Sequence, residues 1–544
     1  MNRMSQIAPD RALATDQWWR GAAIYQIYPR SFLDTNGDGI GDLAGITQRL
    51  DHIADMGIDA VWISPFYTSP MVDFGYDVAD YCAVDPIFGT LADFDALIER
   101  AHALGLKVMV DQVYSHTSDL HAWFAQSRMD RSNPKADWFV WADPKPDGSP
   151  PNNWQSVFGG PSWTWDARRG QYYMHNFLKE QPQLNCALPQ VQDALLDVAR
   201  FWLDRGVDGF RFDAFSFSAH NPALTDNPAR GADGAQRTRS FDFQLQLHNQ
   251  SQPASVDFAR RIRALCDSYE AVFSLAEVGG VDMDAEMKRY TQGADLLNSA
   301  YSFDFLHAPK LTPALVAETQ ARWSGDGLTG WPSWGFENHD APRAASRWCA
   351  PDQREAFAAM KIALLAALRG TIIVYQGEEL GLDQVDIPFE ALRDPEAIAN
   401  WPLTQSRDGA RTPMPWTAQD EQGGFTSGIP GLPLGEDNLA KAADRQQADP
   451  ASLLALTTRL IKLRRDDPAL RLGSFELLVA DQACLAFRRR HDGRAVLCLF
   501  NLSDHPAPFP LVATTAGRVL ELINGAQPGA ALPPYGAILV EELA

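Results

Sequence analysis

Long apolar runs, clustered cysteines and an excess of basic residues are all missing from this 544-residue sequence. No stretch reaches the roughly 18 apolar residues that a membrane-spanning helix needs. The opening segment, MNRMSQIAPDRALATDQWW, has charges where a secretory signal needs an apolar run. The six cysteines show no CxxC spacing, which disfavours a zinc site or a disulfide framework. We therefore expect free thiols in a soluble, cytoplasmic protein.

The charge balance is strongly acidic, with 69 Asp and Glu against 47 Lys and Arg and a net charge of −22. Nucleic-acid affinity rests largely on Lys and Arg that neutralise phosphates, so we expect no nucleic-acid partner and no membrane partner. A composition of 45% hydrophobic and 21% charged residues is typical of a globular protein. The length allows one large domain with one or two smaller ones, as a monomer or a homodimer.

Short β-rich apolar segments alternate along the chain with longer segments of helical pattern, which is typical of an α/β fold with a parallel sheet. In Leu91–Leu104 and Val191–Arg205, for example, apolar residues recur at three- and four-residue steps. The predicted strands are Ala22–Phe32, Ala60–Tyr67, Lys107–Tyr114, Gly209–Phe215, Ala271–Val278, Asn298–Phe305, Gly330–Phe336 and Gly370–Tyr375. Eight such units predict a (β/α)8 TIM barrel.

Two irregular segments and a change of pattern divide the chain further. The segment 117–188 is rich in Pro, Gly, Asn, Trp and Asp and far exceeds an ordinary βα loop, so we predict an inserted lobe, domain B, over the barrel mouth. A second excursion, 377–430, should flank the same mouth. Short alternating runs then predict a C-terminal antiparallel β-sandwich domain at 469–544. This assigns 1–116 and 189–468 to the catalytic barrel.

Three acidic residues stand where predicted strands give way to loops. They are Asp213 in GFRFDAF, Glu277 in SLAEVGG and Asp340 in FENHDAPR. The carboxyl ends of barrel strands face one cavity, so these side chains should meet there. Cleavage of an acetal bond between sugars needs one carboxylate to attack and one carboxylic acid to protonate the leaving oxygen, without an organic cofactor. The pattern therefore favours a sugar-cleaving site.

The immediate surroundings of two acids suit these tasks. Arg211 and Asp213 point to the same side of one strand, so the guanidinium should favour the ionised carboxylate that a nucleophile requires. Glu277 ends an apolar run that should bury its carboxyl and raise its pKa, as a general acid needs. The alternatives are an ordinary Arg–Asp ion pair and a Glu that faces solvent or starts a helix.

The motifs together resemble the α-amylase superfamily of glycoside hydrolases, family 13, in its α-glucosidase and oligo-1,6-glucosidase branch. The resemblance runs from YQIYPRSFLDTNGDGIGDLAGI through GYDVADY, VMVDQVYSHTS, QPQLN, GFRFDAF, SLAEV and FENHD to SRDGARTPMPW. Each motif alone is weak, but their order and spacing are specific. The resemblance implies that Asp213 is the nucleophile, Glu277 the acid/base and Asp340 the third catalytic acid, which grips the sugar hydroxyls.

The same resemblance implies a set of substrate-binding residues. They are Asp73, Tyr76, His116, Arg211, His339, Arg343 and Arg411. Asp73 and Tyr76 are expected to close the blind end of a glucose pocket, with Arg411 paired to Asp73. His116 is expected to have Asp111 behind it, and Ser115 stands before it where the family commonly has Asn. Ordinary structural roles stay open for His116, Arg343 and Arg411.

Potential oxygen ligands occupy every second position of one early loop. They are Asp34, Asn36, Asp38, Ile40 and Asp42. Glycines between them would let the chain wrap a hard cation. An EF-hand is rejected, because Gly45 stands where that loop needs a Glu and a strand precedes the segment. The resemblance implies a structural Ca²⁺ or Mg²⁺ ion held by these acids, the Asn and a backbone carbonyl, and the alternative is a Gly-rich turn.

The activity implied by the resemblance is that of a retaining, exo-acting α-glucosidase acting on short α-glucosides. The segment FDFQLQLHNQSQPASVDFARRIRAL resembles a bacterial subgroup that also transfers glucose to alcohol acceptors. Ala214 follows the predicted nucleophile, and the resemblance implies that a small residue at this position accompanies α-1,4 linkages, as in maltose. The alternatives are an oligo-1,6-glucosidase, an endo-acting amylase, a sucrose- or trehalose-converting relative, and a non-catalytic barrel that would be expected to lack one of the three acids.

Overall fold

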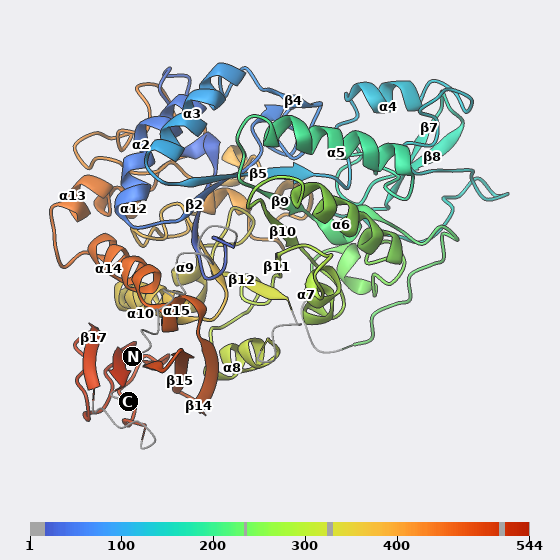
Figure 1. Cartoon of the computed structure of the whole chain (residues 1–544). Helices are drawn as coiled ribbons and strands as arrows, with labels where there is room; N and C mark the ends of the chain where they lie inside the picture. The colour runs from blue at the N-terminus through green and yellow to red at the C-terminus, as the bar shows by residue number, and fades with distance from the viewer. Residues whose placement is uncertain (1–16, 233–236, 324–329, 511–516, 543–544) are drawn as a thin grey trace, which may run out of the picture.

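The computed structural model describes residues 17–232, 237–323, 330–510 and 517–542. The opening segment without an apolar signal falls mostly outside these ranges. Eight parallel strands close into a barrel in chain order (Figure 1). They are β1 (Ala23–Ile27), β2 (Ala60–Ile63), β5 (Lys107–Val113), β9 (Gly209–Asp213), β10 (Phe273–Glu277), β11 (Ser299–Tyr301), β12 (Trp331–Gly335) and β13 (Thr371–Tyr375). The predicted TIM barrel and its eight strands are confirmed.

Helices follow the strands and cover the outside of the barrel (Figure 1). They are α2 (Leu43–Asp55), α3 (Leu91–Ala103), α5 (Pro189–Leu203), α6 (Pro253–Cys266), α7 (Met283–Thr291), α8 (Pro313–Ala321), α10 (Arg354–Ala367) and α14 (Leu453–Asp466). Local sequence sets their starts: Thr90 and Asp93 form a capping box on α3, and Pro189 occupies the first turn of α5. The two helices predicted from periodicity are α3 and α5.

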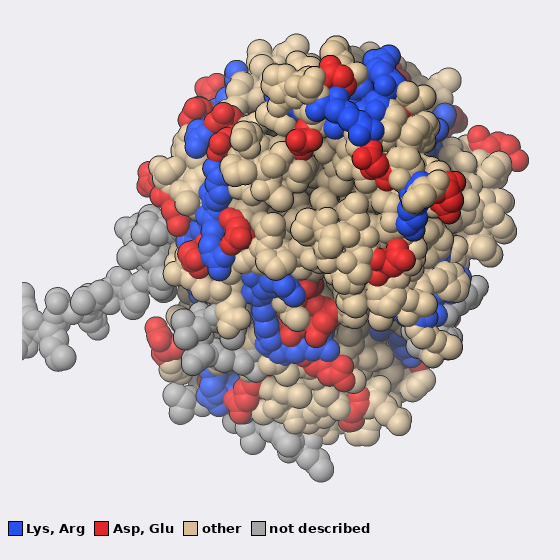
Figure 2. Space-filling view, turned by 90° about the vertical axis from the view of Figure 1, so that its right-hand side faces the viewer, with Lys and Arg blue, Asp and Glu red and all other residues tan. Residues whose placement is uncertain are grey.

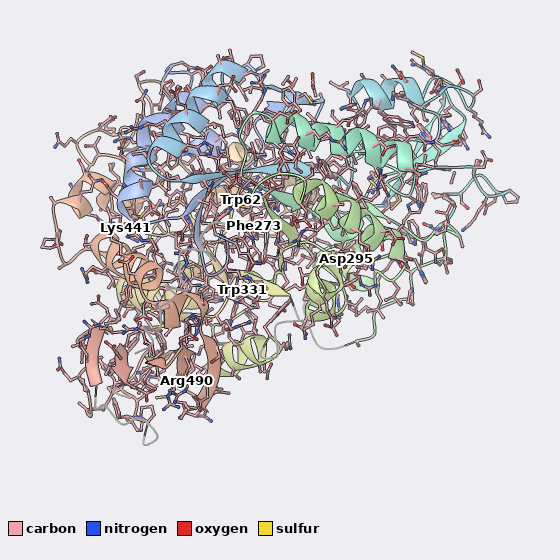
Figure 3. The ribbon with its side chains drawn as sticks, in the orientation of Figure 1. Trp62, Phe273, Asp295, Trp331, Lys441 and Arg490 are labelled. Carbon is pink, nitrogen blue, oxygen red and sulfur yellow. The ribbon has the colours of Figure 1, made fainter. Side chains whose placement is uncertain are left out.

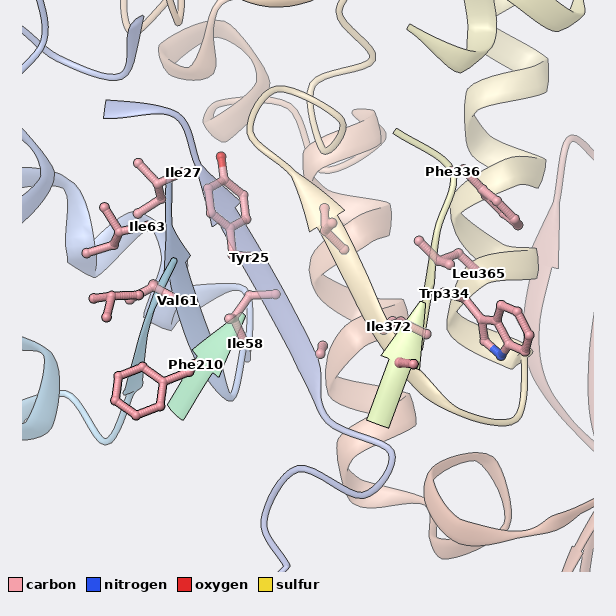
Figure 4. Packing of buried hydrophobic residues seen from close by; sticks show 14 of the residues in the cluster. Tyr25, Ile27, Ile58, Val61, Ile63, Phe210, Trp334, Phe336, Leu365 and Ile372 are labelled. Carbon is pink, nitrogen blue, oxygen red and sulfur yellow. The ribbon is translucent and has the colours of Figure 1, made fainter. Parts of the chain in front are cut away.

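The strands are buried on both faces, which makes the barrel a rigid frame. Trp62, Phe273 and Trp331 belong to a cluster packed inside the barrel (Figure 3). Val61 and Ile372 belong to the larger cluster between the strands and the surrounding helices (Figure 4). Close packing on both sides fixes where each strand ends, and therefore where the side chains at the barrel mouth start.

The segment between β5 and α5 forms a small lobe with its own sheet. Its elements are α4 (Ala122–Ser127), β6 (Trp141–Ala142), β7 (Trp163–Asp166) and β8 (Gln171–Met174), with strand order β6-β8-β7. A hairpin of β3 (Tyr67–Thr68) and β4 (Asp80–Val84) lies after β2. Trp154, Trp163 and Met174 fill the core of the lobe. The domain boundaries set from the sequence stay predictions.

The predicted C-terminal antiparallel β domain is confirmed. Its described strands form one sheet in the order β14-β15-β16-β18-β17. They are β14 (Ser474–Ala480), β15 (Cys484–His491), β16 (Arg494–Asn501), β17 (Gly517–Ile523) and β18 (Ala537–Glu542). Four of these were expected from alternating apolar runs. The fifth, β17, is an edge strand that was not predicted, and one of its seven residues is buried.

Short helices complete the described chain. They are α9 (Ala344–Trp348), α11 (Pro395–Ala399), α12 (Glu436–Ala440), α13 (Ala443–Gln447) and α15 (Pro468–Leu472), with 3-10 turns η1 (Pro29–Ser31), η2 (Phe215–Ser218), η3 (Ser240–Phe243), η4 (Pro351–Gln353), η5 (Phe389–Ala391) and η6 (Arg407–Ala410). All six cysteines are unpaired. Basic and acidic side chains lie interspersed over the face in Figure 2. Within the described ranges, every helix is too short or too polar to cross a membrane.

Candidate active site

The predicted catalytic acids meet at the carboxyl ends of the barrel strands. Asp213 is the last residue of β9, Glu277 the last residue of β10, and Asp340 follows β12 in a loop. They line one cavity of about 310 Å³ at the barrel mouth. Its lining also includes Asp73, Tyr76 and His116 of the predicted binding set. This is the end of a TIM barrel at which catalytic sites are built.

One guanidinium joins the acids of neighbouring strands. Arg211 is fully buried, and its Nη1 lies 2.5 Å from Oδ1 of Asp213 while its Nη2 lies 2.6 Å from Oε1 of Glu277. The backbone N–H of Ala214 and the hydroxyl of Tyr301 also donate to Glu277, at 2.9 and 3.0 Å. Two carboxylates bridged in this way fit the short separation of about 5 to 5.5 Å found in retaining glycosidases.

Burial and charge oppose each other at Asp213. Loss of solvent raises the pKa of Asp213 well above that of an ordinary aspartate, and the nearby Glu277 raises it further, although Arg211 lowers it. The expected effect of Arg211 is therefore present but outweighed. Asp111, 2.6 Å from the same guanidinium, also has its pKa raised, to about 6, mainly by burial. Asp213 and Asp111 thus share one positive charge, and the raised pKa of each favours retention of a proton by this pair at mildly acidic pH.

At Asp340 the neighbouring positive charges outweigh burial in setting the pKa of the carboxyl group. Desolvation favours its neutral form, but His339, Arg407 and Arg411 together lower the pKa of Asp340 well below its usual range. Arg411 Nη2 lies 2.8 Å and Arg407 Nη1 3.1 Å from the same carboxylate oxygen. Burial lowers the pKa of His339 to about 4, so the ring is neutral at pH 7. Asp340 is therefore an ionised acceptor held in place by two guanidinium groups.

Asp73, which was predicted to close the blind end of the pocket, forms an ion pair within the cavity lining. Oδ1 of Asp73 lies 3.2 Å from Nη2 of Arg407, and Oδ2 accepts a hydrogen bond from the Gln181 amide at 3.0 Å. Burial raises the pKa of Asp73 to about 6. The predicted pairing of Asp73 with Arg411 is wrong, because Arg411 is bonded to Asp340 instead. Arg407 stands four residues earlier in the motif SRDGARTPMPW, which was the signal that could have identified it.

His116 lies at the cavity wall in an uncharged form. Burial lowers its pKa to about 4. Its Nε2 lies 3.0 Å from the carbonyl oxygen of Tyr76, and its Nδ1 lies 2.8 Å from the hydroxyl of Ser115. Ser115 thus contacts the ring directly at the position where an Asn was expected. Tyr76 in turn stacks on His339, with ring centroids 5.2 Å apart.

Asp111 does not serve as the partner of His116 that the sequence predicted. Its carboxylate accepts hydrogen bonds from Arg211, from the indole N–H of Trp62 at 2.9 Å and from the hydroxyl of Tyr76 at 3.3 Å. It therefore orients Arg211 and the pocket tyrosine rather than the histidine.

Arg343 lies apart from the other predicted binding residues. It is buried, with Nη1 3.2 Å from Glu337 and 2.8 Å from the carbonyl oxygen of Gln376. Arg211, His339, Arg343 and Arg411 are all absent from the described cavity lining. The other three each contact one of the acids that line it, whereas Arg343 contacts Glu337. The prediction that Arg343 contacts substrate is therefore not supported, and the alternative of a scaffold arginine fits its surroundings.

The outer half of the cavity was not predicted. It is lined by the phenylalanines Phe158, Phe177, Phe217, Phe241 and Phe303, and by Arg239, Asp242 and Glu396. These residues come from the inserted lobe, the segments after β9 and β11, and the excursion after β13. No single motif carries them, because their proximity arises only from the packing of these separate segments.

The early acidic loop is held by its own hydrogen bonds. Asp34 accepts from the backbone N–H groups of Asn36, Gly37 and Gly39, and from the hydroxyl of Thr426 at 2.5 Å. Asp42 caps α2 through the N–H of Gly45. The donors Asp34, Asn36, Asp38 and Asp42 are oxygen ligands of the kind that a hard cation prefers. However, no group of three or more His, Cys, Asp or Glu side chains in the described ranges is arranged to hold a metal.

A closed parallel barrel with paired carboxylates at neighbouring strand ends defines the chain as a barrel glycoside hydrolase. Residues 26–473 match the family model described as "Alpha amylase, catalytic domain". The chain belongs to this α-amylase family, glycoside hydrolase family 13, and is an enzyme of that family. The resemblance stated from the sequence motifs is confirmed.

Three proteins that are similar over most of this chain have names that refer to glucosidase or glucosyl-transfer activity. A probable alpha-glucosidase of Rhizobium meliloti (strain 1021) is 50% identical over 510 residues, covering 92% of each chain. An oligo-1,6-glucosidase of Heyndrickxia coagulans is 36% identical over 532 residues, covering 91% of this chain and 93% of the relative. The solved structure of an alpha-glucosyl transfer enzyme, XgtA, has a TM-score of 0.92 and 50% identity, covering 97% of this chain and all of that one.

Proposed function

We propose that this enzyme is a retaining α-glucosidase that removes single glucose units from the non-reducing ends of short α-glucosides. The observation that carries the proposal is the bridge from Arg211 to both Asp213 and Glu277 inside one cavity. A nucleophile and an acid/base held this close suit a covalent glucosyl-enzyme intermediate. Inverting enzymes instead need about 6.5 to 9.5 Å between the two groups to admit a water molecule.

The proposed reaction has two steps. In the first, a carboxylate oxygen of Asp213 bonds to the anomeric carbon while the glycosidic C–O bond breaks, and Glu277 gives its proton to the departing oxygen. In the second, Glu277 takes a proton from water or an acceptor alcohol, whose oxygen bonds to the same carbon and releases Asp213. Two inversions restore the α configuration. Asp340 would hold the sugar hydroxyls as an ionised acceptor, and such contacts accelerate the reaction only if they tighten in the transition state.

Cleavage of single units would follow from a cavity that is closed at one end. The ion pair of Asp73 with Arg407 belongs to the cavity lining, and we propose that it blocks the path beyond the first sugar. A volume of about 310 Å³ lies at the low end of the range for small-ligand pockets and suits a short substrate. An endo-acting amylase needs a groove open at both ends, so this geometry favours the exo-acting alternative.

The linkage and the acceptor are the finer parts of the proposal. Ala214 lines the cavity directly after Asp213, and we propose a preference for α-1,4 linkages on that basis. We also propose glucosyl transfer to alcohols, which is supported by the 50% identity to a protein named as an alpha-glucosyl transfer enzyme. The second candidate is α-1,6 cleavage, which is favoured by the similarity to a protein named as an oligo-1,6-glucosidase.

Product analysis separates these candidates. Maltose, isomaltose, sucrose, trehalose and starch would each be incubated with the enzyme, with and without added glycerol, and the products resolved by chromatography. We expect glucose from maltose faster than from isomaltose, little action on starch and α-glucosyl glycerol when glycerol is present. Faster cleavage of isomaltose would establish the second candidate, isomerised sucrose or trehalose would establish a converting enzyme, and no turnover of any sugar would refute the glucosidase proposal.

The pH profile of kcat/KM should decrease at its acidic end because the pKa of Asp213 is raised. Because Asp213 must be ionised to attack, kcat/KM falls as pH decreases through that pKa, which lies above the value of about 3.9 of an exposed aspartate. The apparent pKa belongs to the interacting acids around Arg211 rather than to one residue. Measurement of kcat/KM on maltose between about pH 4 and 8 checks this. Full activity retained at the acidic end would contradict it.

The structural ion stays a prediction of the loop sequence. If Ca²⁺ binds the folded loop, the protein should unfold at a higher temperature with Ca²⁺ than with a chelator, and a 100-fold excess over Kd corresponds to about 2.7 kcal/mol of stability. The variant Asp38→Ala removes one exposed ligand and should lose this difference. Equal unfolding midpoints with Ca²⁺, with Mg²⁺ and with chelator would show that the segment is a Gly-rich turn. No organic cofactor enters the proposed mechanism.

A further inference from the structure

Four charged side chains lie buried together outside the cavity, near the ends of β12 and β13. They are Glu337, Arg343, Lys361 and Glu378, each at most 2% exposed, and we name them the charge cluster. Lys361 Nζ lies 2.5 Å from Glu337 and 2.8 Å from Glu378. Arg343 Nη1 lies 3.2 Å from the second oxygen of Glu337. None of the four is part of the described cavity lining, so their contacts with the rest of the chain indicate what they do.

Buried ion pairs are weak evidence for stability, because apolar side chains of similar volume often fill such a space at least as well. The cluster does, however, fix one group firmly. Glu337 is held by Lys361 and by the backbone N–H of Ala344, at 3.1 Å, and therefore presents a fixed carboxylate to Arg343. The fork of Arg343 is planar, so fixing one of its edges sets the direction of the others.

The other donors of Arg343 reach two carbonyl groups. Nη1 donates to Gln376 at 2.8 Å, and Nη2 donates to Ala410 at 3.3 Å. The ring of Tyr375 lies under the guanidinium, 4.5 Å from its carbon, and its hydroxyl donates to the same Ala410 carbonyl at 3.0 Å. The carbonyl of Ala410 therefore accepts two hydrogen bonds from residues at the end of the barrel.

Ala410 belongs to the segment that carries the two arginines paired with Asp73 and Asp340. We name residues 407–411 the clamp turn: Arg407 begins it and Arg411 ends it. Its start is attached as well, because the backbone N–H of Arg343 donates to Gln384 at 2.9 Å and the Gln384 amide donates to the carbonyl of Ser406 at 3.2 Å. Arg343 thus connects to the chain at both ends of this turn.

We propose that the charge cluster, with Tyr375, is a positioning frame for the clamp turn. It holds the turn where Arg407 reaches Asp73 and where Arg411 reaches Asp340, at 3.2 and 2.8 Å. Arg343 and Tyr375 are positioning residues, since they act through the arginines of the turn and do not touch the sugar. The inference rests on the proposed glucosidase function for its kinetic test.

The kinetic test is a double-mutant cycle on an α-glucoside that the wild type hydrolyses, with Tyr375→Phe as the first variant. It removes one hydroxyl and keeps the ring under Arg343. We expect kcat/KM to fall about 5- to 20-fold, as for the loss of one hydrogen bond on a transition-state contact. In an Arg411→Met background the same change should cost less than about twofold, because the group through which it acts is gone.

Arg343→Lys is the second variant to be tested in the same double-mutant cycle. The ammonium keeps a positive charge beside Glu337 but cannot span two carbonyls, so kcat/KM should fall by a similar factor and depend in the same way on Arg411. Arg347→Met is the matched control. Arg347 lies on α9, one turn from Arg343, and donates to the carbonyl of Phe336 at 3.0 Å without contacting the clamp turn. We expect this control to keep kcat/KM within about twofold of the wild type.

Equal losses in the wild-type and Arg411→Met backgrounds would overturn the proposal, and so would unchanged activity in Tyr375→Phe. If the wild type hydrolysed no α-glucoside, the proposed function would fail on its own, and a crystal structure of Tyr375→Phe would test the frame. The frame predicts a displaced Ala410 carbonyl and a lost contact of Arg411 with Asp340. A clamp turn in its original place would refute it.

Discussion

Replacing Asp213 with Asn is expected to lower kcat on maltose by at least about 10,000-fold, the scale seen when a covalent nucleophile is removed. Asn has the same shape but carries no charge, so it cannot form the glucosyl ester. It can still accept a hydrogen bond from Arg211, so the fold should persist. Steady-state kinetics and the thermal unfolding midpoint, measured on the same preparation, check both statements.

An added nucleophile that takes the place of Asp213 should give a product that identifies the role of this residue. In Asp213→Ala the space of the carboxylate is open, so azide should partly restore cleavage of an activated α-glucoside and yield the β-glucosyl azide. Asp242→Asn, a change of the same type in the same cavity lining, is the control and should keep most of the activity. Near-normal turnover by Asp213→Asn would refute the assignment of the nucleophile.

Replacing Glu277 with Gln is expected to cost roughly 100- to 10,000-fold in kcat/KM on maltose, the usual contribution of a general acid. The loss should be much smaller on α-glucosyl fluoride, because fluoride departs without needing a full proton transfer. Tyr301 donates to Oε1 and Ala214 to Oε2, so the amide oxygen of Gln can keep the hydrogen bond from Tyr301 while the one from Ala214 is lost. Because Gln has the same size as Glu, the fold of the site should persist.

The comparison of the two substrates decides the role of Glu277. Equal losses on maltose and on the fluoride would mean that Glu277 orients the sugar or Arg211 rather than protonating the leaving oxygen. Glu396→Gln serves as the control, because Glu396 also lines the cavity but lies in the excursion, paired with Arg239 at 3.0 Å. Its effect should not depend on the leaving group.

The barrel could be predicted because its strands and helices carry strong local patterns. Strands such as β9 and β13 are short apolar runs followed by loops, and α3 and α5 repeat apolar residues with the period of a helix. The edge strand β17 was missed, whereas β14, the other edge strand of the same sheet, was predicted although more of its residues are exposed. Exposure at a sheet edge therefore does not by itself explain the difference.

The candidate site also contains residues that could be predicted from the sequence and residues that could not. Asp213 and Glu277 could be found because each ends a strand, and the strand order places their side chains together. Arg407 and Glu396 come from an excursion whose path depends on contacts with distant segments, and sequence spacing does not reveal those contacts. The net pKa of Asp213 was also beyond reach, because the sequence displays Arg211 beside it but not the depth of its burial.

The residues that line the cavity come from two kinds of segment: the barrel strands and the segments that connect them. Asp213 and Glu277 belong to barrel strands packed between two layers, whereas Phe158, Phe241 and Glu396 belong to three separate segments outside the barrel strands. Under the proposed function, amino-acid changes in these segments are expected to alter which molecule receives the glucosyl group while Asp213 and Glu277 stay in place. Directed evolution toward new acceptors can therefore be confined to the mouth, leaving the catalytic pair and its shared arginine untouched.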